Sequence, residues 1–427
     1  MRPLARWSAV AAMIVALVAC APGDGPPAVT TLFVNPTSGS DAGPGTAAAP
    51  LRTLSAALAL ADAGMTIRLA AGTYDAANGE TWPTQVGFPP TATPNVPSGV
   101  TIVGVSGVRL VGPGAGTTAA ALAFAGPASV RAVEMEGFER ALLAWLPGVV
   151  TLTGIRATGN LVDGLLAFGD AEVVAALSTF DLNGLSGVAA FGDAVLDLQG
   201  GTLEFNRTGL YVTDRATVGV LDTRIASNGS TAAESHSGVY AIGDARLTLS
   251  GVTLDGNAFA GVELRGEARV SLTDATVVGH AYGLYVENVG TGVAWLRVYD
   301  SDVSGNITGV AWSSGPGGEL FVRGTTVHSN AGVGVEIWGE PAVVDLGAAG
   351  EASGNRFEGN GTVQLYDFRW SRPAADGPVI TVDVNAIVPA GCLMAIDTYL
   401  GPYTYSCGGV LAFGIGGTNQ RIRVVSP

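Results

Sequence analysis

Glu263, Arg265 and Glu287 have the residue types and spacing that most favour chemistry, with His236 upstream of them. Two carboxylates, a guanidinium and an imidazole could supply an acid, a base and a group that binds a carboxylate. The same charges could instead form a solvated ion-pair ladder, which would add little to stability. The choice depends on whether the fold brings these four residues together.

A repeat runs from about Met135 to Asn360. Glycines followed by a branched apolar residue recur at steps of about 22–29 residues, a period typical of solenoids. Each period holds three short segments in which apolar residues alternate, which is the spacing of strands and not of helices. The pairs are Gly164-Leu165, Gly187-Val188, Gly209-Leu210, Gly238-Val239, Gly261-Val262, Gly283-Leu284, Gly309-Val310 and Gly334-Val335.

Three strands per turn predict an all-β fold, a single-stranded parallel β-helix of about ten coils. We expect it to be right-handed, since crossovers between parallel strands favour that hand. The apolar residue after each glycine should point inward, as Leu142 does after Ala141. The coils need caps at both ends, because an uncovered coil is an exposed sheet edge.

Asparagine marks one turn of each period. Asn tolerates left-handed φ, and its amide can bond to the copy in the next coil. These residues are therefore expected to form a structural ladder, with His280 at one place where Asn is expected. The asparagines are Asn160, Asn183, Asn206, Asn228, Asn257, Asn306, Asn330 and Asn355.

The residues two and four positions beyond each glycine should point outward. In the first coils the residues four positions beyond are aromatic, and in the middle coils the outward residues include Glu263, Arg265 and Glu287. Aromatic rings could stack on sugars, or they could pack on one another or under a loop. The candidate carbohydrate-binding residues are Trp145, Phe168, Phe191, Tyr211, Tyr240 and Tyr285.

A third ladder is acidic and follows the first strand of each coil. Stacked carboxylates repel unless a cation such as Ca²⁺ bridges them, although Asp after Gly is also ordinary turn chemistry. Arg215 interrupts the stack. No other cofactor is expected. The candidate metal ligands are Asp170, Asp193, Asp244 and Glu267, with Asp214 between them.

The composition excludes some partners. The net charge is −15, and all 21 basic residues are Arg. An acidic surface without a basic run argues against nucleic acid and against electrostatic adhesion to anionic lipid. We expect an extracytoplasmic monomer.

Residues 1–20 are expected to be a signal peptide. Arg2 and Arg6 precede an apolar run, and Leu17-Val18-Ala19-Cys20 resembles the bacterial lipoprotein box. That resemblance implies a lipid on Cys20 that anchors the chain to a membrane of the cell envelope. The alternative is an ordinary secretory signal. Residues 21–30 would be a tether, and Cys392 and Cys407 are expected to form a disulfide.

Residues 31–112 carry the most specific resemblance. Gly43-Pro44-Gly45-Thr46, Pro50-Leu51-Arg52-Thr53-Leu54 and Ala71-Gly72-Thr73-Tyr74 resemble the N-terminal module of the DUF1565 family. That module opens right-handed parallel β-helix proteins of the pectate-lyase-like superfamily. Thr53 or Ser55 can cap a short helix ending at Gly64, which would cover the first coil.

The remaining divisions follow from the repeat. We expect residues 76–97 to be a protruding loop, 113–360 to be β-helix repeats and 361–427 to be a C-terminal β cap. Two strands are expected within that cap, at 379–384 and 421–425.

Three functions remain open. The leading hypothesis is a non-catalytic surface or envelope module that binds polysaccharide. The alternatives are a polysaccharide lyase or glycoside hydrolase acting through the four residues named first, and a structural spacer or adhesin. The chain has no Asn-Thr-Asp, Gly-His-Gly and Arg-Ile-Lys set like that of polygalacturonases, and no Lys that a lyase could use as a base.

Overall fold

The computed structural model describes residues 30–86, 91–229, 236–287, 293–313, 317–338, 343–347 and 354–361, and beyond them the backbone of short strands up to residue 425. The chain divides into Met1–Thr30 and a second unit, Thr31–Pro427, which is the subject below. The expected signal peptide, the expected lipid on Cys20, residues 21–29 of the expected tether and the expected Cys392–Cys407 disulfide lie outside the described residues and stay predictions.

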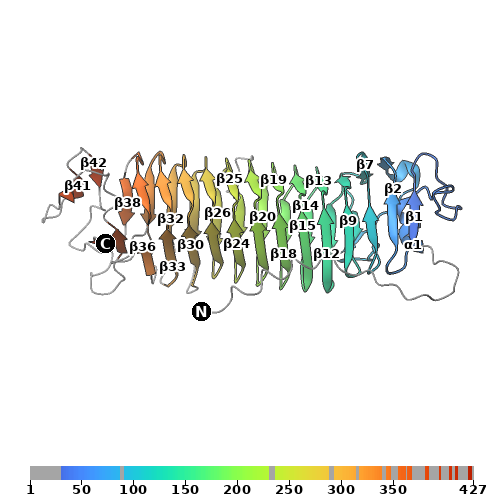
Figure 1. Cartoon of the computed structure of the whole chain (residues 1–427), viewed down its shortest axis with the longest axis horizontal. Helices are drawn as coiled ribbons and strands as arrows, with labels where there is room; N and C mark the ends of the chain where they lie inside the picture. Colours follow the sequence, from blue (N-terminus) through green and yellow to red (C-terminus); the bar gives the residue numbers. More distant parts are fainter. Residues whose placement is uncertain are drawn as a thin grey trace. The chain divides into compact units, whose positions relative to one another are not determined.

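Each coil of the second unit gives one strand to each of three sheets, and the coils stack in sequence order (Figure 1). Within the described residues the first sheet has 15 strands, the second 12 and the third 11. All the neighbours within these sheets pair parallel and in register, which confirms the predicted three-strand parallel β-helix.

The first sheet consists of β1 (Thr31–Val34), β2 (Thr66–Leu69), β6 (Thr101–Val103), β9 (Ala128–Arg131), β12 (Gly148–Thr153), β15 (Ala171–Ala176), β18 (Val195–Gln199), β21 (Thr217–Leu221), β24 (Arg246–Ser250), β27 (Arg269–Thr273), β30 (Trp295–Tyr299), β33 (Glu319–Arg323), β36 (Val343–Leu346), β39 (Ile380–Asp383) and β43 (Ile422–Val425). The second sheet consists of β3 (Gly72–Tyr74), β7 (Val108–Val111), β10 (Glu134–Glu136), β13 (Arg156–Thr158), β16 (Thr179–Asp181), β19 (Thr202–Glu204), β22 (Arg224–Ala226), β25 (Thr253–Asp255), β28 (Thr276–Val278), β31 (Asp302–Ser304), β34 (Thr326–His328) and β37 (Arg356–Glu358).

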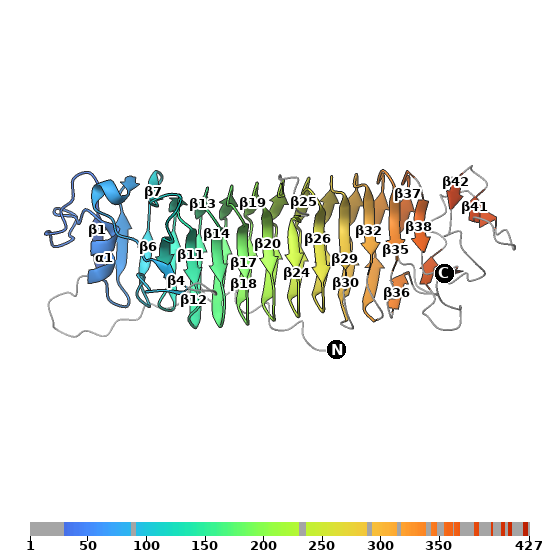
Figure 2. The ribbon, with the colours of Figure 1, turned by 180° about the vertical axis from the view of Figure 1, so that it is seen from behind.

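The third sheet carries the candidate site, and Figure 2 labels many of its strands in succession. It consists of β8 (Ala120–Ala123), β11 (Arg140–Ala144), β14 (Asp163–Ala167), β17 (Ser186–Ala190), β20 (Thr208–Val212), β23 (Val239–Ala241), β26 (Ala260–Arg265), β29 (Tyr282–Glu287), β32 (Thr308–Trp312), β35 (Val333–Ile337) and β38 (Val363–Asp367).

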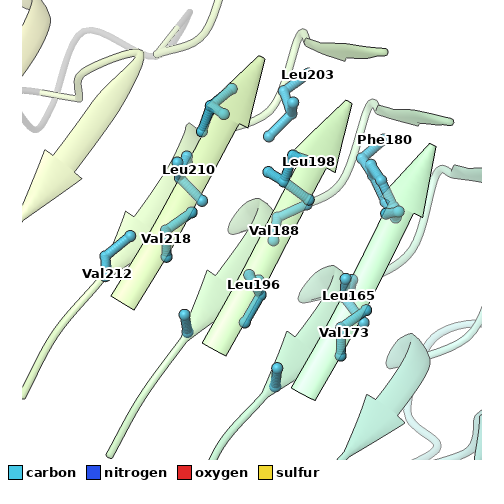
Figure 3. Close-up of a cluster of buried hydrophobic side chains, with 14 of the residues drawn as sticks. Leu165, Val173, Phe180, Val188, Leu196, Leu198, Leu203, Leu210, Val212 and Val218 are labelled. Atoms are coloured by element: carbon cyan, nitrogen blue, oxygen red, sulfur yellow. The ribbon is translucent and has the colours of Figure 1, made fainter. Parts of the chain in front are cut away.

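The core is a set of aliphatic ladders that run from coil to coil. Leu165, Val188 and Leu210 lie opposite one another on β14, β17 and β20, and all three are fully buried (Figure 3). Each such side chain contributes about 1.5–3 kcal/mol by leaving water. The register extends from Leu142 to Val335, so the inward ladder predicted from the glycine repeat is confirmed.

The asparagine ladder fills the turn between the second and third sheets. Asn206 is typical: its Oδ1 accepts from the backbone N–H and the side-chain amide of Asn183, both at 2.9 Å. Its Nδ2 donates to the Phe180 carbonyl at 2.9 Å and to Asn228 Oδ1 at 3.2 Å. The side chain is 1% exposed. The ladder thus satisfies backbone groups that the turn would otherwise bury without partners.

His280 occupies the expected Asn position and reproduces the same contacts. Its Nδ1 accepts from the Asn257 backbone N–H at 2.9 Å, and its Nε2 lies 3.2 Å from the Leu254 carbonyl oxygen. These roles require a neutral ring with its proton on Nε2, and burial lowers the pKa of His280, which favours that form. This histidine is a structural residue.

Asn355 was placed in the wrong ladder. The residue that accepts from the Asn330 backbone N–H is Asn360, at 3.1 Å. Asn355 instead accepts from Thr325 N at 3.0 Å. It therefore belongs to a second turn ladder, between the first and second sheets, which continues through Ser301.

The N-terminal end has a short helix, α1 (Leu54–Leu60), capped by Thr53, whose side chain accepts from Ala56 N. The helix ends before Gly64, where it was expected to end. Its first amides also donate to the buried carboxylate of Glu80.

The described parts of the segment from 76 to 97, residues 76–86 and 91–97, pack against the coils and do not form the protruding loop that was expected. The segment contains a 3₁₀ turn, η1 (Ala76–Asn78), and an antiparallel pair, β4 (Gln85–Val86) with β5 (Thr91–Ala92). Gln85 and Ala92 are buried, because this hairpin packs on the outer face of the third sheet.

Both strands expected near the C-terminus are present. β39 pairs with β36 and β43 pairs with β39, both parallel, so the first sheet continues past residue 361. A small antiparallel sheet, β40 (Met394–Ala395), β41 (Tyr403–Tyr405) and β42 (Gly409–Leu411), accompanies them.

Among the described residues, no helix has the length and apolar character needed to cross a membrane.

Candidate binding face on the third sheet

The outward residues of the third sheet form one row across the coils. Residues two positions beyond each glycine pair directly, as predicted. The row reads Leu143, Leu166, Ala189, Tyr211, Tyr240, Glu263, Tyr285, Ala311 and Glu336. The first three residues of the row are apolar and the next two are tyrosines. The last four include the two carboxylates, Glu263 and Glu336.

Rings on this face lie against one another from coil to coil. Trp145 and Phe168 stack with 6.0 Å between centroids and 9° between planes. Phe191 and Tyr211 lie 5.3 Å apart, and Tyr211 stacks on Tyr240 at 5.5 Å. Such pairs add about 0.5–1.5 kcal/mol each beyond the area they bury. We call these five rings the aromatic file.

Part of the aromatic file packs under the hairpin. Phe168 is 8% exposed and belongs with Ala92, Leu143 and Leu166 to an apolar cluster outside the main core. Trp145, Phe191 and Tyr211 pack against that cluster and remain partly exposed. The packing alternative therefore holds for Phe168, while the other rings keep a face toward solvent.

The hairpin also closes one end of the face through a buried charge. Arg140 donates to Asp163 at 3.0 Å and to Gln85 at 3.0 Å, and both members of the ion pair are almost fully buried. Breaking such a pair leaves an uncompensated charge. This contact fixes the hairpin on the sheet.

The structure brings together three of the four residues first singled out. Arg265 Nε donates to Glu263 Oε1 at 2.9 Å, and Arg265 Nη2 lies 2.9 Å from Glu287 Oε2. The second oxygen of Glu263 accepts from Ser237 Oγ at 2.6 Å. The guanidinium lies 5.6 Å from the Tyr240 ring centroid. The ion cluster thus continues the aromatic file.

Glu263 is the unusual carboxylate of this cluster. It is 2% exposed, and burial raises its pKa above the ordinary value despite the opposing contacts with Ser237 and Arg265. One guanidinium engages both carboxylates of the cluster. Arg265 therefore offsets part of the negative charge of the two carboxylates. Because both carboxylates point to the same guanidinium, they do not face each other across a space that a substrate could occupy.

His236 is not joined to that cluster by a direct contact. Its Nε2 accepts from Arg207 Nε at 2.6 Å, and burial together with this cation lowers its pKa. The next residue, Ser237, is the one that reaches Glu263. Ser237 reaches Glu263 and His236 contacts Arg207 because their side chains point in different directions at the end of the insertion. The repeat in the sequence does not specify these directions.

The acidic turn ladder shows ion pairing within the described residues. Arg215 donates to both oxygens of Asp193, at 2.7 and 2.6 Å, and lowers the pKa of that carboxyl. Asp214 accepts from the Gly192 backbone N–H. No group of three or more His, Cys, Asp or Glu side chains that could hold a metal is found in the described part of the chain. Calcium binding stays a prediction.

A further cluster lies on the first sheet and was missed. The Arg297 guanidinium lies 3.6 Å from the Trp295 ring centroid, and Arg269 lies 5.7 Å from the same ring. Arg297 is also 5.0 Å from the Phe321 ring. The residues occupy adjacent strands, so their alternation with apolar neighbours could have revealed this cluster. It provides a matched aromatic surface on a different face.

Comparison with known families supports the fold. Residues 37–112 match the model of a protein of unknown function, DUF1565, and residues 144–320 match the model of a right handed beta helix region. The resemblance to the DUF1565 module and the right hand of the coil are thereby confirmed. The class is a right-handed parallel β-helix protein that opens with a DUF1565 segment.

Solved structures with similar folds are distant in sequence. A pectate lyase is 15% identical, covering 79% of this chain and 74% of its own, with a TM-score of 0.34. The mannuronan C-5 epimerase A-module of Azotobacter vinelandii is 14% identical, covering 87% and 92%, with a TM-score of 0.38. A lacto-N-biosidase from Eubacterium ramulus is 11% identical, covering 79% and 64%, with a TM-score of 0.30. No curated protein matches the chain significantly.

Proposed function

We propose that this protein is a non-catalytic polysaccharide-binding module of the cell envelope, and that the outer face of the third sheet holds the glycan. The observation that supports this is the aromatic file. Trp145, Phe191, Tyr211 and Tyr240 all keep solvent-facing surface. Phe191, Tyr211 and Tyr240 lie ring against ring over successive coils, and Trp145 stacks on Phe168.

The physical basis is the repetition of weak contacts. A partly exposed ring offers apolar area to the faces of a sugar and, for tyrosine, a hydroxyl to its edges. One such contact is weak. A polymer that crosses several coils makes many contacts at once, and linked contacts raise the overall affinity without any one being strong.

The ion cluster favours binding over catalysis. A general acid or base must reach the proton that it transfers. The two oxygens of Glu263 are occupied by Ser237 and Arg265, and the same Arg265 engages Glu287. The cluster orders this end of the face and holds Arg265 beside the Tyr240 ring.

The test is retention of the soluble chain from Ala21 in gels that contain neutral or acidic polysaccharides. We expect slowed migration in at least one glycan, lost in Tyr211→Ala and weakened in Trp145→Ala. Trp295→Ala is the matched control, since it removes a partly exposed ring from the first sheet. Equal retention of all four proteins would contradict a site on the third sheet.

The same samples test the enzymatic alternative. Reducing ends and unsaturated sugars would be followed with Ca²⁺ and with chelator. Release of either product by the wild type, lost in Glu263→Ala, would replace the binding proposal with a lyase or hydrolase.

We also propose that lipid on Cys20 anchors the module outside the cytoplasm. The lipoprotein-like Leu17-Val18-Ala19-Cys20 sequence supports this. Labelled palmitate should enter the wild type expressed in bacteria and should not enter Cys20→Ala. Equal labelling of the two would contradict the anchor.

A further inference from the structure

The third sheet itself contains two arginines in its described strands, and each is paired with a carboxylate of the same sheet. Arg140 is 8% exposed, bound to Asp163 and covered by the hairpin. Arg265 is held between Glu263 and Glu287 and lies beside a tyrosine ring. The two carboxylates already offset the positive charge of Arg265, which weakens its attraction for a third carboxylate.

Two arginines at the margins of the face are also engaged. Arg215, in the turn after β20, binds both oxygens of Asp193. Arg207, in the turn before β20, donates to the ring of His236. The cations nearest the aromatic file are therefore used within the protein.

Acidic groups dominate the surroundings. Glu263, Glu287 and Glu336 lie on the face and outnumber Arg265. The acidic turn ladder borders it, and the whole chain carries a net charge of −15. Such a field repels a polyanion and leaves an uncharged ligand unaffected.

The ring spacing indicates how a ligand would lie. The file has one ring per coil, and the centroids of the pairs Trp145–Phe168, Phe191–Tyr211 and Tyr211–Tyr240 are 5.3–6.0 Å apart. Figure 2 shows the strands of the third sheet side by side along the stack of coils. The rings of the file come from successive coils of this sheet, so the file runs across the strands. A ligand that uses several rings must therefore be extended and must cross the strands.

From these observations we infer that the ligand of this face is an uncharged, extended glycan, and that uronate polymers are excluded. This inference rests on the proposed function. It adds the chemical class of the ligand, which the aromatic file alone does not specify.

The test uses pairs of oligosaccharides that differ only in charge. β-1,4-Mannohexaose is compared with the β-1,4-linked hexamer of mannuronate, and cellohexaose with the corresponding glucuronate hexamer. Binding to the chain from Ala21 is measured by calorimetry at low and moderate salt. The neutral member of at least one pair should bind at least about tenfold more tightly, a difference of about 1.4 kcal/mol. Its affinity should change little with salt.

The outcomes separate the inference from the function on which it rests. An acidic hexamer that binds as tightly as its neutral partner, with Tyr211→Ala abolishing both, overturns the uncharged class and keeps the binding face. Glu287→Gln should narrow the gap between the members of a pair, because it removes one repelling carboxylate. Absence of binding by all four hexamers and by the gel glycans would overturn both proposals.

Discussion

Replacing Asn206 with alanine should destabilise the solenoid locally and strongly. The substitution removes the acceptor of the Asn183 backbone N–H and the donor to the Phe180 carbonyl, both at 2.9 Å and both buried. An unsatisfied buried group costs about 1–3 kcal/mol, so the two together predict a loss of about 2–6 kcal/mol. Water cannot restore either bond without entering a site that is 1% exposed.

The assay must report on the coil and not only on the whole chain. Repeat proteins can unfold in parts, so a single midpoint does not measure one interaction. Hydrogen exchange followed by mass spectrometry should show faster exchange of the Asn183 amide in Asn206→Ala. Urea unfolding followed by circular dichroism should show an earlier transition.

The control removes an amide whose partners are exposed. Asn35 accepts from the backbone N–H groups of Thr37 and Ser38, both at 3.0 Å, in a turn that water reaches. Asn35→Ala should therefore cost less than about 1 kcal/mol. If Asn206→Ala lost no more stability than this control, and exchange at Asn183 were unchanged, the ladder would not be the stabilising element described here.

Three further predictions concern the same coils. Burial lowers the pKa of His280, so the stability that this residue contributes is complete above about pH 6.5 and is lost as the pH falls through the lowered pKa. Below about pH 6.5, His280→Asn should therefore gain stability relative to the wild type. A difference in unfolding free energy between the two proteins that stays constant with pH would refute this. Burial raises the pKa of Glu263, so its stabilisation is complete below about pH 4.3 and is lost as pH rises. The melting temperature of Glu263→Gln should therefore improve relative to the wild type with rising pH, and a difference that stays constant with pH would contradict this. Gly187→Ala would place a Cβ 2.8 Å from Asn206 Nδ2 and should cost about 1–3 kcal/mol in urea unfolding; a cost below 0.5 kcal/mol would contradict the close packing.

Residues that repeat once per coil could be predicted well. The inward ladder through Leu165 and the outward row through Tyr211 follow directly from the glycine period, because a parallel in-register stack places equivalent residues opposite one another. The same logic placed His280 in the asparagine ladder. A period therefore specifies which residues are neighbours along the stack.

Contacts that break the period could not be predicted in this way. The hairpin was taken for a loop because Pro, Asn and Thr dominate residues 76–97, whereas its packing depends on Gln85 meeting Arg140 far along the chain. Asn355 and Asn360 are only five residues apart, but they lie on either side of β37, in two different turns of the same coil, and the spacing of asparagines alone does not tell these turns apart. His236 lies beside an insertion, where no repeat sets the direction of a side chain.

The contacts between polar side chains on the outer face of the third sheet were predicted in part. The pairing of Arg265 with Glu263 and Glu287 follows from the row, but the bond from Ser237 does not, since Ser237 precedes the strand in the insertion. The cation–π cluster around Trp295 was missed because it lies on the first sheet, whereas the glycine pattern points only to the strands of the third sheet.

The central claim is that a glycan lies on the aromatic file of the third sheet. Hydroxyl-radical footprinting of the chain from Ala21, with and without whichever gel glycan retains it, measures this most directly. The glycan should protect Trp145, Phe191, Tyr211 and Tyr240 from oxidation and leave Trp295 as reactive as before. Protection of Trp295 with no protection of the aromatic file would contradict it.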